Sequence, residues 1–186
     1  MISLRAPSDA ELAEFLVEHE GEPFSYPEVG ATRGELPAGY RIDRRKEVIG
    51  RGDEAFERGR LALDRWQAHV GAGVRVTPVE PPRPDLTVAL VVRAAGLYTT
   101  SGCRVAYCIR EPDRVGFAYG TLRDHPVSGE ERFLIERASN GEVTFELLAF
   151  SRPVAMLFKI ASPFTRRTQR ALGVAYIEAL RTAIAR

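Results

Sequence analysis

Residues 103–150 read CRVAYCIREPDRVGFAYGTLRDHPVSGEERFLIERASNGEVTFELLAF, and this stretch decides the fold. Its apolar residues fall into runs that are separated by turn sequences containing Pro, Gly, Asp and Asn. The last turn, Asn140-Gly141, is the strongest hairpin signal in the chain because both residues accept a positive φ. Four consecutive antiparallel strands are therefore predicted, at residues 103–109, 115–122, 130–137 and 142–150.

Successive side chains along a strand point to opposite faces of the sheet. One face of the predicted strands is apolar, and it carries Val105, Tyr107, Ile109, Val115, Phe117, Tyr119, Phe133, Ile135, Val143, Phe145 and Leu147. The other face is charged, and it carries Arg104, Arg110, Glu130, Arg132, Glu136, Glu142 and Glu146. We expect the charged face to meet water or to form cross-strand ion pairs. An antiparallel sheet with one apolar face needs a cover.

The C-terminal segment supplies that cover. Its apolar residues keep helical spacing over about 30 positions, and they are Leu157, Ile160, Phe164, Leu172, Ala175, Tyr176, Ala179, Leu180 and Ile184. Within this segment Ser162-Pro163 is typical of a helix start, because Ser caps a helix and Pro fits its first position. The pattern predicts a short helix, a kink and then a long helix that lies across the sheet.

The first 39 residues predict a helix followed by a long loop. Ser8 and Glu11 form a capping box at the start of the helix. Prolines and glycines interrupt residues 22–39, so no regular structure is expected there. This loop carries Phe24 and Tyr26. Their rings either plug the loop onto the body of the protein or make it a lid over a pocket.

Three more strands and one helix are predicted between the loop and residue 103. Residues 40–49 form an edge strand or a solvated strand, because charged residues fill the middle of the run. Asp53 caps the helix, and one face of this helix carries Phe56, Gly59, Leu63, Trp66 and Val70. Short strands at residues 74–79 and 87–92 raise the expected total to about seven.

The predicted elements fit one α+β domain. The 186 residues are 45% hydrophobic, which suffices for a single sizeable core. We expect an N-terminal helix and loop at residues 1–39, a sheet with an inserted helix at 40–150, and a C-terminal helix at 153–186.

Composition argues against several functional classes. Lys and Arg total 26 against 25 Asp and Glu, whereas a nucleic-acid binder normally has a clear basic excess. The first residues lack the apolar run of a secretory signal, and no run of about 18 apolar residues is present, so neither a signal peptide nor a spanning helix is expected. Cys103 and Cys108 are an odd number of positions apart in one strand, which predicts opposite faces and neither a disulfide nor shared metal ligation. Two free thiols fit a reducing, cytoplasmic location, and no metal or other cofactor is expected.

Two segments carry sequence motifs, FSYPEVGATRGELPAGY at residues 24–40 and GFAYGTLRDHPVSGEERFLIE at residues 116–136. They resemble a bacterial and plant family that is described as a domain of unknown function. The elements that its members share are YGTL, HP, SGEE, AFSRP and a TRR-Q helix, which stand here at residues 119–122, 125–126, 128–131, 149–153 and 165–169.

The order strand, helix, strands, helix is similar to the helix-grip fold of the START, Bet v 1 and polyketide-cyclase superfamily. This resemblance implies a curved antiparallel sheet wrapped around a long C-terminal helix. Helix-grip proteins mostly bind lipids, sterols, aromatic polyketides or plant hormones in the cavity between sheet and helix. The partner that the resemblance implies is therefore a small hydrophobic or amphipathic molecule.

Glu131 has the same parity as Phe133 and Ile135, so its carboxylate is expected on the cavity side unless a bulge intervenes. A carboxylate there needs a partner or a raised pKa. The other candidates for a ligand pocket share this face, and they are Tyr107, Phe117, Tyr119, Thr121, Phe133 and Phe145. A small number of polar groups that converge in an apolar pocket is typical of a ligand-binding site. The alternative is that Glu131 lies at the rim of the sheet and pairs with an arginine in water.

An enzyme of cyclase or hydrolase type is a second hypothesis. In it, Glu131 acts with Tyr107 or Tyr119 as acid and base. His125 is another candidate for catalysis because imidazole titrates near neutrality, although a His-Pro pair is more often simply a turn. The sequence decides neither the ligand nor whether a reaction occurs.

A basic cluster marks the start of the long helix. Arg166, Arg167 and Arg170 lie in its first turns, where the helix macrodipole favours anions. Either sheet carboxylates such as Glu146 neutralise these arginines, or a phosphate or lipid headgroup binds to them. The second alternative predicts a peripheral membrane or protein-interaction module, and contact with a membrane surface is not favoured.

Overall fold

The structure of the protein, a computed structural model, describes residues 1–123, 125–153 and 162–185, the last range without the side chains of residues 162–170. Among these residues an eight-stranded antiparallel sheet has the order β2-β8-β7-β6-β5-β4-β3, with β1 paired to β5. The strands are β1 (Ile2–Ser3), β2 (Arg41–Arg51), β3 (Arg75–Thr77), β4 (Thr87–Ala94), β5 (Leu97–Glu111), β6 (Arg114–Thr121), β7 (Val127–Arg137) and β8 (Glu142–Pro153). The helices are α1 (Asp9–Glu18), the 3-10 turn η1 (Ala31–Arg33), α2 (Gly52–Asp64), α3 (Gln67–Gly71) and α5 (Ser162–Ile184).

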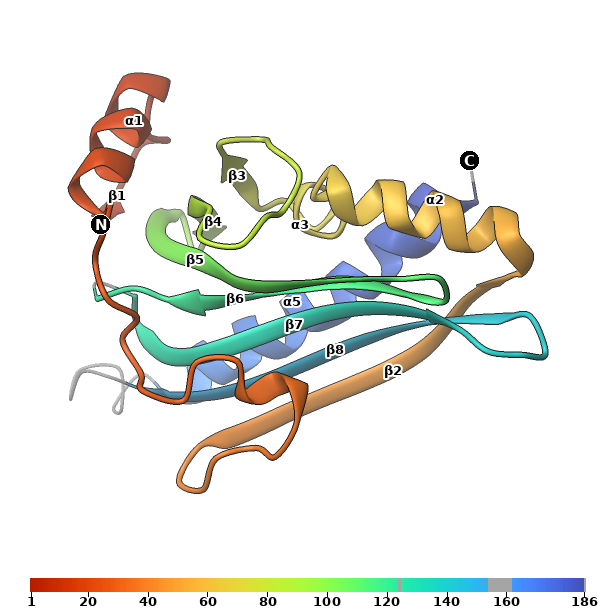
Figure 1. The fold of residues 1–186 in the computed structure, drawn as a ribbon. Coiled ribbons are helices and arrows are strands. Elements are labelled where there is room, and N and C mark those ends of the chain that lie inside the picture. The colour runs from red at the N-terminus through yellow and green to blue at the C-terminus, as the bar shows by residue number, and fades with distance from the viewer. Residues whose placement is uncertain (124, 154–161, 186) are drawn as a thin grey trace.

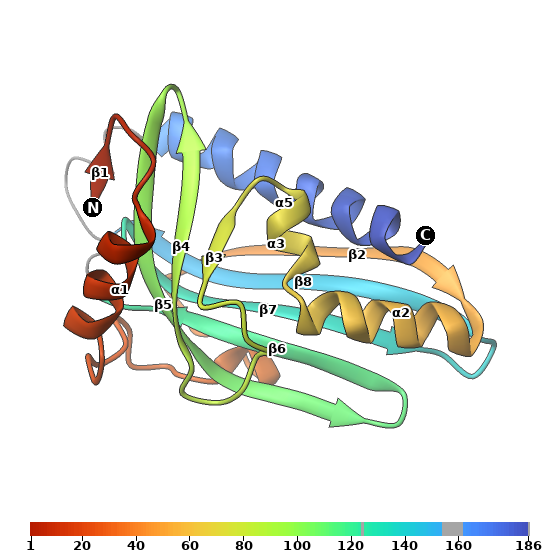
Figure 2. The ribbon, with the colours of Figure 1, turned by 90° about the horizontal axis from the view of Figure 1, so that it is seen from above.

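The sheet is curved, and its two faces are covered differently. Helices α2, α3 and α5 lie on the inner face, and the loop that contains η1 lies on the outer face (Figures 1 and 2). This is the α+β arrangement expected of a helix-grip fold. The edge position expected for residues 40–49 is also confirmed, because β2 ends the order of strands. The short helix expected around Leu157 and Ile160 lies outside the described residues.

Aromatic residues of the inner face meet the helices in one core. Phe117 and Phe133 stack with their ring centroids 5.2 Å apart, and Phe145 lies 6.2 Å from Phe133. From α5, Tyr176 meets Phe133 at 5.4 Å. All of these rings are buried. The predicted meander, with the C-terminal helix across its apolar face, is therefore confirmed.

The inserted helix differs from the prediction at both ends. Arg51 occupies the cap position of α2, whereas the expected cap, Asp53, lies in the first turn. Trp66 has a left-handed φ of 54° between α2 and α3, so the two helices do not continue one stripe. As a result, Val70 is 50% exposed, while Trp66 is fully buried as expected.

A bulge in β5 changes which side chains of that strand face the core. The register with β6 shifts between Val105 and Tyr107, and a one-residue bulge reverses the alternation of all later positions. Val105 lies in the core as predicted, but Tyr107 points to the outer face, where its hydroxyl oxygen is 2.7 Å from Thr32 Oγ1. The same shift packs Cys108 against the core, so the prediction that the two cysteines lie on opposite faces is wrong.

The loop before β2 is fastened to the outer face through one carboxylate. Glu130 accepts hydrogen bonds from Tyr26 Oη (2.8 Å), Gly30 N (2.6 Å) and Thr32 N (3.0 Å). Gly120 lies directly beneath the loop, because a Cβ at this position would be 2.0 Å from Tyr26 Oη. The loop is therefore a plug on the face opposite α5, and the alternative that it is a lid is wrong.

The loop also buries three charged residues, which were expected either to meet water or to form cross-strand ion pairs. Arg132 donates a hydrogen bond to the Thr32 carbonyl oxygen at 2.6 Å and forms an ion pair with Glu146 of the neighbouring strand. Glu130, Arg132 and Glu146 are all buried. The expectation of water contact is wrong for these three residues, whereas the expected cross-strand ion pair is present. Among the described helices, none combines the length and the hydropathy that a bilayer crossing requires.

Candidate functional site

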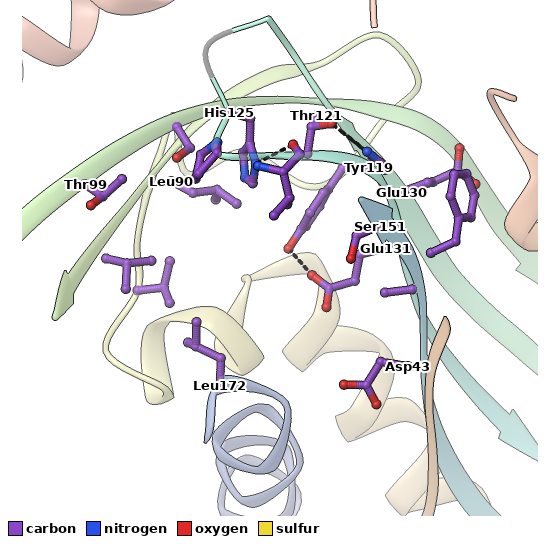
Figure 3. A pocket seen from close by; sticks show the side chains of 18 of the residues that line it. Asp43, Leu90, Thr99, Tyr119, Thr121, His125, Glu130, Glu131, Ser151 and Leu172 are labelled. Carbon is purple, nitrogen blue, oxygen red and sulfur yellow. Dashed lines mark hydrogen bonds between the residues drawn. The ribbon is translucent and has the colours of Figure 1, made fainter. Parts of the chain in front are cut away.

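A cavity of about 350 Å³ lies between the inner face of the sheet and α5. Its apolar wall includes Val74, Leu90, Val92, Leu147 and Leu172. Its polar side chains include Arg41, Asp43, Tyr119, Thr121, Glu131 and Ser151. Figure 3 shows Tyr119 and Glu131 joined by a hydrogen bond on the sheet side, and Leu172 on the α5 side.

Strand register places the cavity residues of the sheet in two rows. The first row crosses β2, β8, β7 and β6 through Asp43, Ala149, Glu131 and Tyr119. The second row crosses the same strands through Arg41, Ser151, Gly129 and Thr121. The two rows are two residues apart along each strand, which is roughly 7 Å. Small residues at the centre of both rows leave space that larger side chains would fill.

A chain of hydrogen bonds runs from the core into the cavity. Tyr119 donates its hydroxyl proton to Glu131 Oε2 at 2.6 Å, and His69 Nε2 lies 3.2 Å from the same hydroxyl oxygen. Because the tyrosine proton points to the carboxylate, the tautomer that fits carries the His69 proton on Nε2 and donates it to Tyr119. His69 Nδ1 is then a buried acceptor with no partner among the described residues. The ring of His69 therefore positions Tyr119.

Burial sets the protonation state of this chain. Removal from water raises the pKa of Glu131 to about 7, the charge of Asp43 adds to the rise, and the hydrogen bond from Tyr119 opposes it. Burial lowers the pKa of His69 to about 3, so its ring is neutral. Burial also raises the pKa of Tyr119, which keeps its proton. Near neutral pH Glu131 thus exchanges between carboxyl and carboxylate, as a general acid or base does.

His125 also lines the cavity, from the turn between β6 and β7. Its Nδ1 lies 2.9 Å from the carbonyl oxygen of Val127 and 3.2 Å from the nitrogen of the same residue. Burial lowers the pKa of His125 to about 4. The imidazole is therefore neutral at neutral pH and is engaged within its own turn, which makes it a poor base.

The predicted ligand-binding residues fall in three places. Tyr119, Thr121 and Glu131 line the cavity. Phe117, Phe133 and Phe145 belong to the packed core beside it. Tyr107 lies on the outer face, where Arg33 stacks over its ring at 3.9 Å, because the bulge in β5 reverses its direction.

The two remaining predictions concern arginines. No arginine pairs with Glu131 among the described residues, so the alternative of a rim ion pair for this residue has no support. The side chains of Arg166, Arg167 and Arg170 lie outside the described residues. Their predicted anion site stays a prediction.

The residues that sequence reasoning missed include Arg41, Asp43 and Tyr176, which line the cavity, and His69, which contacts Tyr119 from the core. Alternation along β2 gives no signal for the first two, because the apolar residues Ile42 and Val48 have the opposite parity and are exposed in the structure. The charge of that strand led to its interpretation as solvated. For His69 no sequence signal exists, because the helix break at Trp66 decides its direction.

Comparison with known proteins shows relatives over most of the chain. Residues 25–179 match the family described as domain of unknown function, DUF1990. A UPF0548 protein of Deinococcus radiodurans is 37% identical over 184 residues, which cover 91% of this chain and 92% of that protein.

Solved structures share the fold at low sequence identity. A hypothetical protein from Helicobacter pylori has a TM-score of 0.60 at 9% identity, covering 86% of this chain and 95% of that chain. The Zhui aromatase/cyclase from Streptomyces sp. R1128 has a TM-score of 0.59 at 19% identity, covering 79% and 94%. These identities show the fold alone. The match over residues 25–179 spans both cavity rows and most of the outer loop, and the chain therefore belongs to the DUF1990 family.

Proposed function

We propose that the protein binds a small hydrophobic or amphipathic molecule between the sheet and α5. The observation that carries this proposal is the cavity of about 350 Å³, which lies within the range of small-molecule sites, roughly 300–1,000 Å³. Its walls are mostly apolar, and six of its polar side chains lie in two adjacent rows. A cavity of this size costs stability when it serves no ligand, because the lost contacts are not replaced.

The likeness in fold to a protein named as an aromatase/cyclase supports the same use of the space between sheet and helix. Sequence identity with that protein is 19%, so the similarity in fold does not identify the ligand.

A fluorescence titration tests the proposal. Trp66 is the only tryptophan of the chain, and its ring centroid lies 6.4 Å from that of Tyr119 in the cavity wall. Titration with cis-parinaric acid, a fluorescent fatty acid, is expected to give saturable energy transfer from Trp66 to the bound probe.

Two variants of one strand locate the binding site. Ala149→Phe fills the centre of the first row and is expected to weaken binding about tenfold or more. Thr144→Phe adds the same ring on the opposite face of β8 and is expected to bind the probe like the wild type. If the filled variant keeps wild-type affinity while circular dichroism shows it folded, the ligand does not occupy this cavity.

A second candidate function is catalysis of cyclase or hydrolase type. The observation that favours it is the pKa of Glu131, which burial raises to about 7 beside the Tyr119 hydroxyl. As a base, the carboxylate would take a proton from a water molecule that attacks an ester carbonyl, and the protonated Glu131 would then return this proton to the leaving alkoxide, which departs as the alcohol. Tyr107 has no part in this proposal because it lies on the other face.

Hydrolysis of p-nitrophenyl butyrate tests the second candidate. The rate is expected to rise with pH through about 7 and to vanish in Glu131→Gln. Glu136→Gln, on the outer face of the same strand, should keep the wild-type rate. Equal rates in Glu131→Gln and the wild type would remove catalysis by this residue and leave the binding proposal untouched.

A further inference from the structure

Arg41 differs from the other charged residues of the cavity. It is partly buried, and it lines the cavity from the first residue of β2, in the row of Ser151 and Thr121. Its guanidinium makes no hydrogen bond or ion pair with any residue that the structure describes. A guanidinium has five donor N–H groups and stays charged at every physiological pH, so its position in the wall calls for an acceptor.

The carboxylates of the cavity do not neutralise Arg41. Asp43 pairs with Arg45, with 3.4 Å between Arg45 Nε and Asp43 Oδ1. Glu131 takes its hydrogen bond from Tyr119. The carboxylate of Glu130 accepts its hydrogen bonds on the outer face, from the loop. Arg41 therefore carries a permanent positive charge without a partner among the described residues of the wall, whereas Glu131, with its pKa of about 7, is negatively charged only in part near neutral pH.

We propose that the ligand is an amphipathic carboxylic acid whose carboxylate is bound by Arg41. This inference rests on the proposed binding function and names the chemical class of the ligand. A carboxylate matches the planar fork of a guanidinium and can form two parallel hydrogen bonds with it. Ser151 and Thr121 lie in the same row and offer hydroxyl groups beside it.

The rest of the cavity fits the apolar part of such a molecule. Leu90, Val92 and Leu147 line it on the sheet side, and Leu172 lines it on the side of α5. A cationic ligand would meet the charge of Arg41 without a counterion. A neutral ligand would leave the guanidinium partly desolvated and unpaired, which costs binding free energy. A ligand with one negative group on an apolar body can pair with Arg41 and also pack against the apolar side chains of the wall.

A matched pair of probes tests this inference on the full-length protein. The probes are cis-parinaric acid and its methyl ester, which differ only in the charge of the head group. With energy transfer from Trp66 as the signal, the wild type is expected to bind the acid about tenfold or more tightly than the ester. Arg41→Gln is expected to remove this preference by weakening the acid and leaving the ester nearly unchanged.

Two further variants serve as controls. Arg51→Gln removes the same charge from the other end of β2, where Arg51 pairs with Glu142, and it should keep the preference. Arg41→Lys keeps the charge and should keep part of the preference, and it replaces Arg41→Gln if that variant does not fold. In the wild type, the preference should shrink when salt rises from about 20 to about 500 mM, because screening weakens the ion pair.

The outcomes separate the inference from the proposed function. If acid and ester bind with equal affinity in the wild type, the cavity binds ligands but Arg41 does not select a carboxylate, and the inference is overturned. The same holds if Arg41→Gln and Arg51→Gln reduce the preference equally. If neither probe gives energy transfer, the proposed function fails together with the inference.

Discussion

Glu130 and Glu131 are neighbours in β7, but their carboxylates lie on opposite faces of the sheet and accept different numbers of hydrogen bonds. Glu130 is buried under the N-terminal loop and accepts four hydrogen bonds, from Tyr26 Oη, Gly30 N, Thr32 N and Thr32 Oγ1. Glu131 faces the cavity and accepts one, from Tyr119. No cation among the described residues pairs with it.

This difference separates a structural carboxylate from a candidate functional one. A buried charge whose acceptor positions are filled holds its surroundings in one arrangement and has no capacity left for a ligand. A carboxylate with one hydrogen bond in an apolar cavity has a raised pKa and an oxygen that remains open to a ligand. The two acidic residues of the SGEE element therefore have different roles.

Glu130→Gln is expected to have the largest effect on stability. The amide keeps the size of the side chain but places an NH₂ group against N–H and O–H donors of the loop. A buried donor that loses its acceptor costs about 1–3 kcal/mol, and several donors of the loop depend on this carboxylate. Urea unfolding measures this loss in the free energy of unfolding. A loss below about 1 kcal/mol would mean that the loop does not depend on Glu130.

Glu131→Gln is expected to change how stability depends on pH. The pKa of Glu131 is raised to about 7 in the folded protein, against about 4.3 for an unperturbed glutamic acid. The folded state therefore binds the extra proton between these values. The resulting stabilisation is complete below about pH 4.3 and is lost as pH rises through about 7.

This group accounts for at most about 4 kcal/mol between those limits, and less where water in the cavity screens the charge. Gln does not titrate, so the free energy of unfolding of the variant should rise relative to that of the wild type as pH rises. Above neutrality the variant should be the more stable protein. Urea unfolding at about pH 5 and about pH 8 measures the difference. If the free energy of unfolding changes by the same amount between these pH values in both proteins, the pKa of Glu131 is not raised.

Gly120→Ala tests the fit between the loop and the outer face. The added Cβ would lie 2.0 Å from Tyr26 Oη, so the loop must shift. Overpacking of this kind costs about 1–3 kcal/mol. Gly34→Ala is the matched control, since no atom lies within 4 Å of a Cβ there. Equal stability of the two variants, measured by thermal unfolding, would show that Tyr26 does not hold its place.

Tyr119→Phe is expected to cost about 1–3 kcal/mol, because it removes the hydrogen bond to Glu131 and leaves the buried His69 Nε2 without its acceptor. The hydrogen bond from Tyr119 lowers the pKa of Glu131. Without it the pKa of Glu131 should rise, and NMR titration of the Glu131 carboxyl carbon measures the change. A fall in that pKa would contradict the assignment of Tyr119 as the donor.

Local patterns predicted much of the sheet. The turns at residues 111–113, 125–129 and 140–141 separate β5 to β8, and alternation placed Tyr119, Thr121 and Glu131 on the inner face. Pairing of β6 with β7 runs without a shift from Arg114 to Gly120, so parity holds for each residue in that range. The capping box at Ser8 and Glu11 is also present as predicted. These features depend on neighbours in the sequence.

The sequence by itself determined the meander of β5 to β8, the inner face of β6 to β8 and the covering helix, because alternation and helical periodicity are local. Only the tertiary structure decided the bulge that turns Tyr107 outward, the loop that buries Glu130, and the histidine that positions Tyr119. The hydrogen bonds concerned join Tyr107 to Thr32, Tyr26 to Glu130 and His69 to Tyr119, across 75, 104 and 50 positions of the chain. Contacts between residues so far apart leave no periodic trace in the sequence, since they arise only when separate elements pack together.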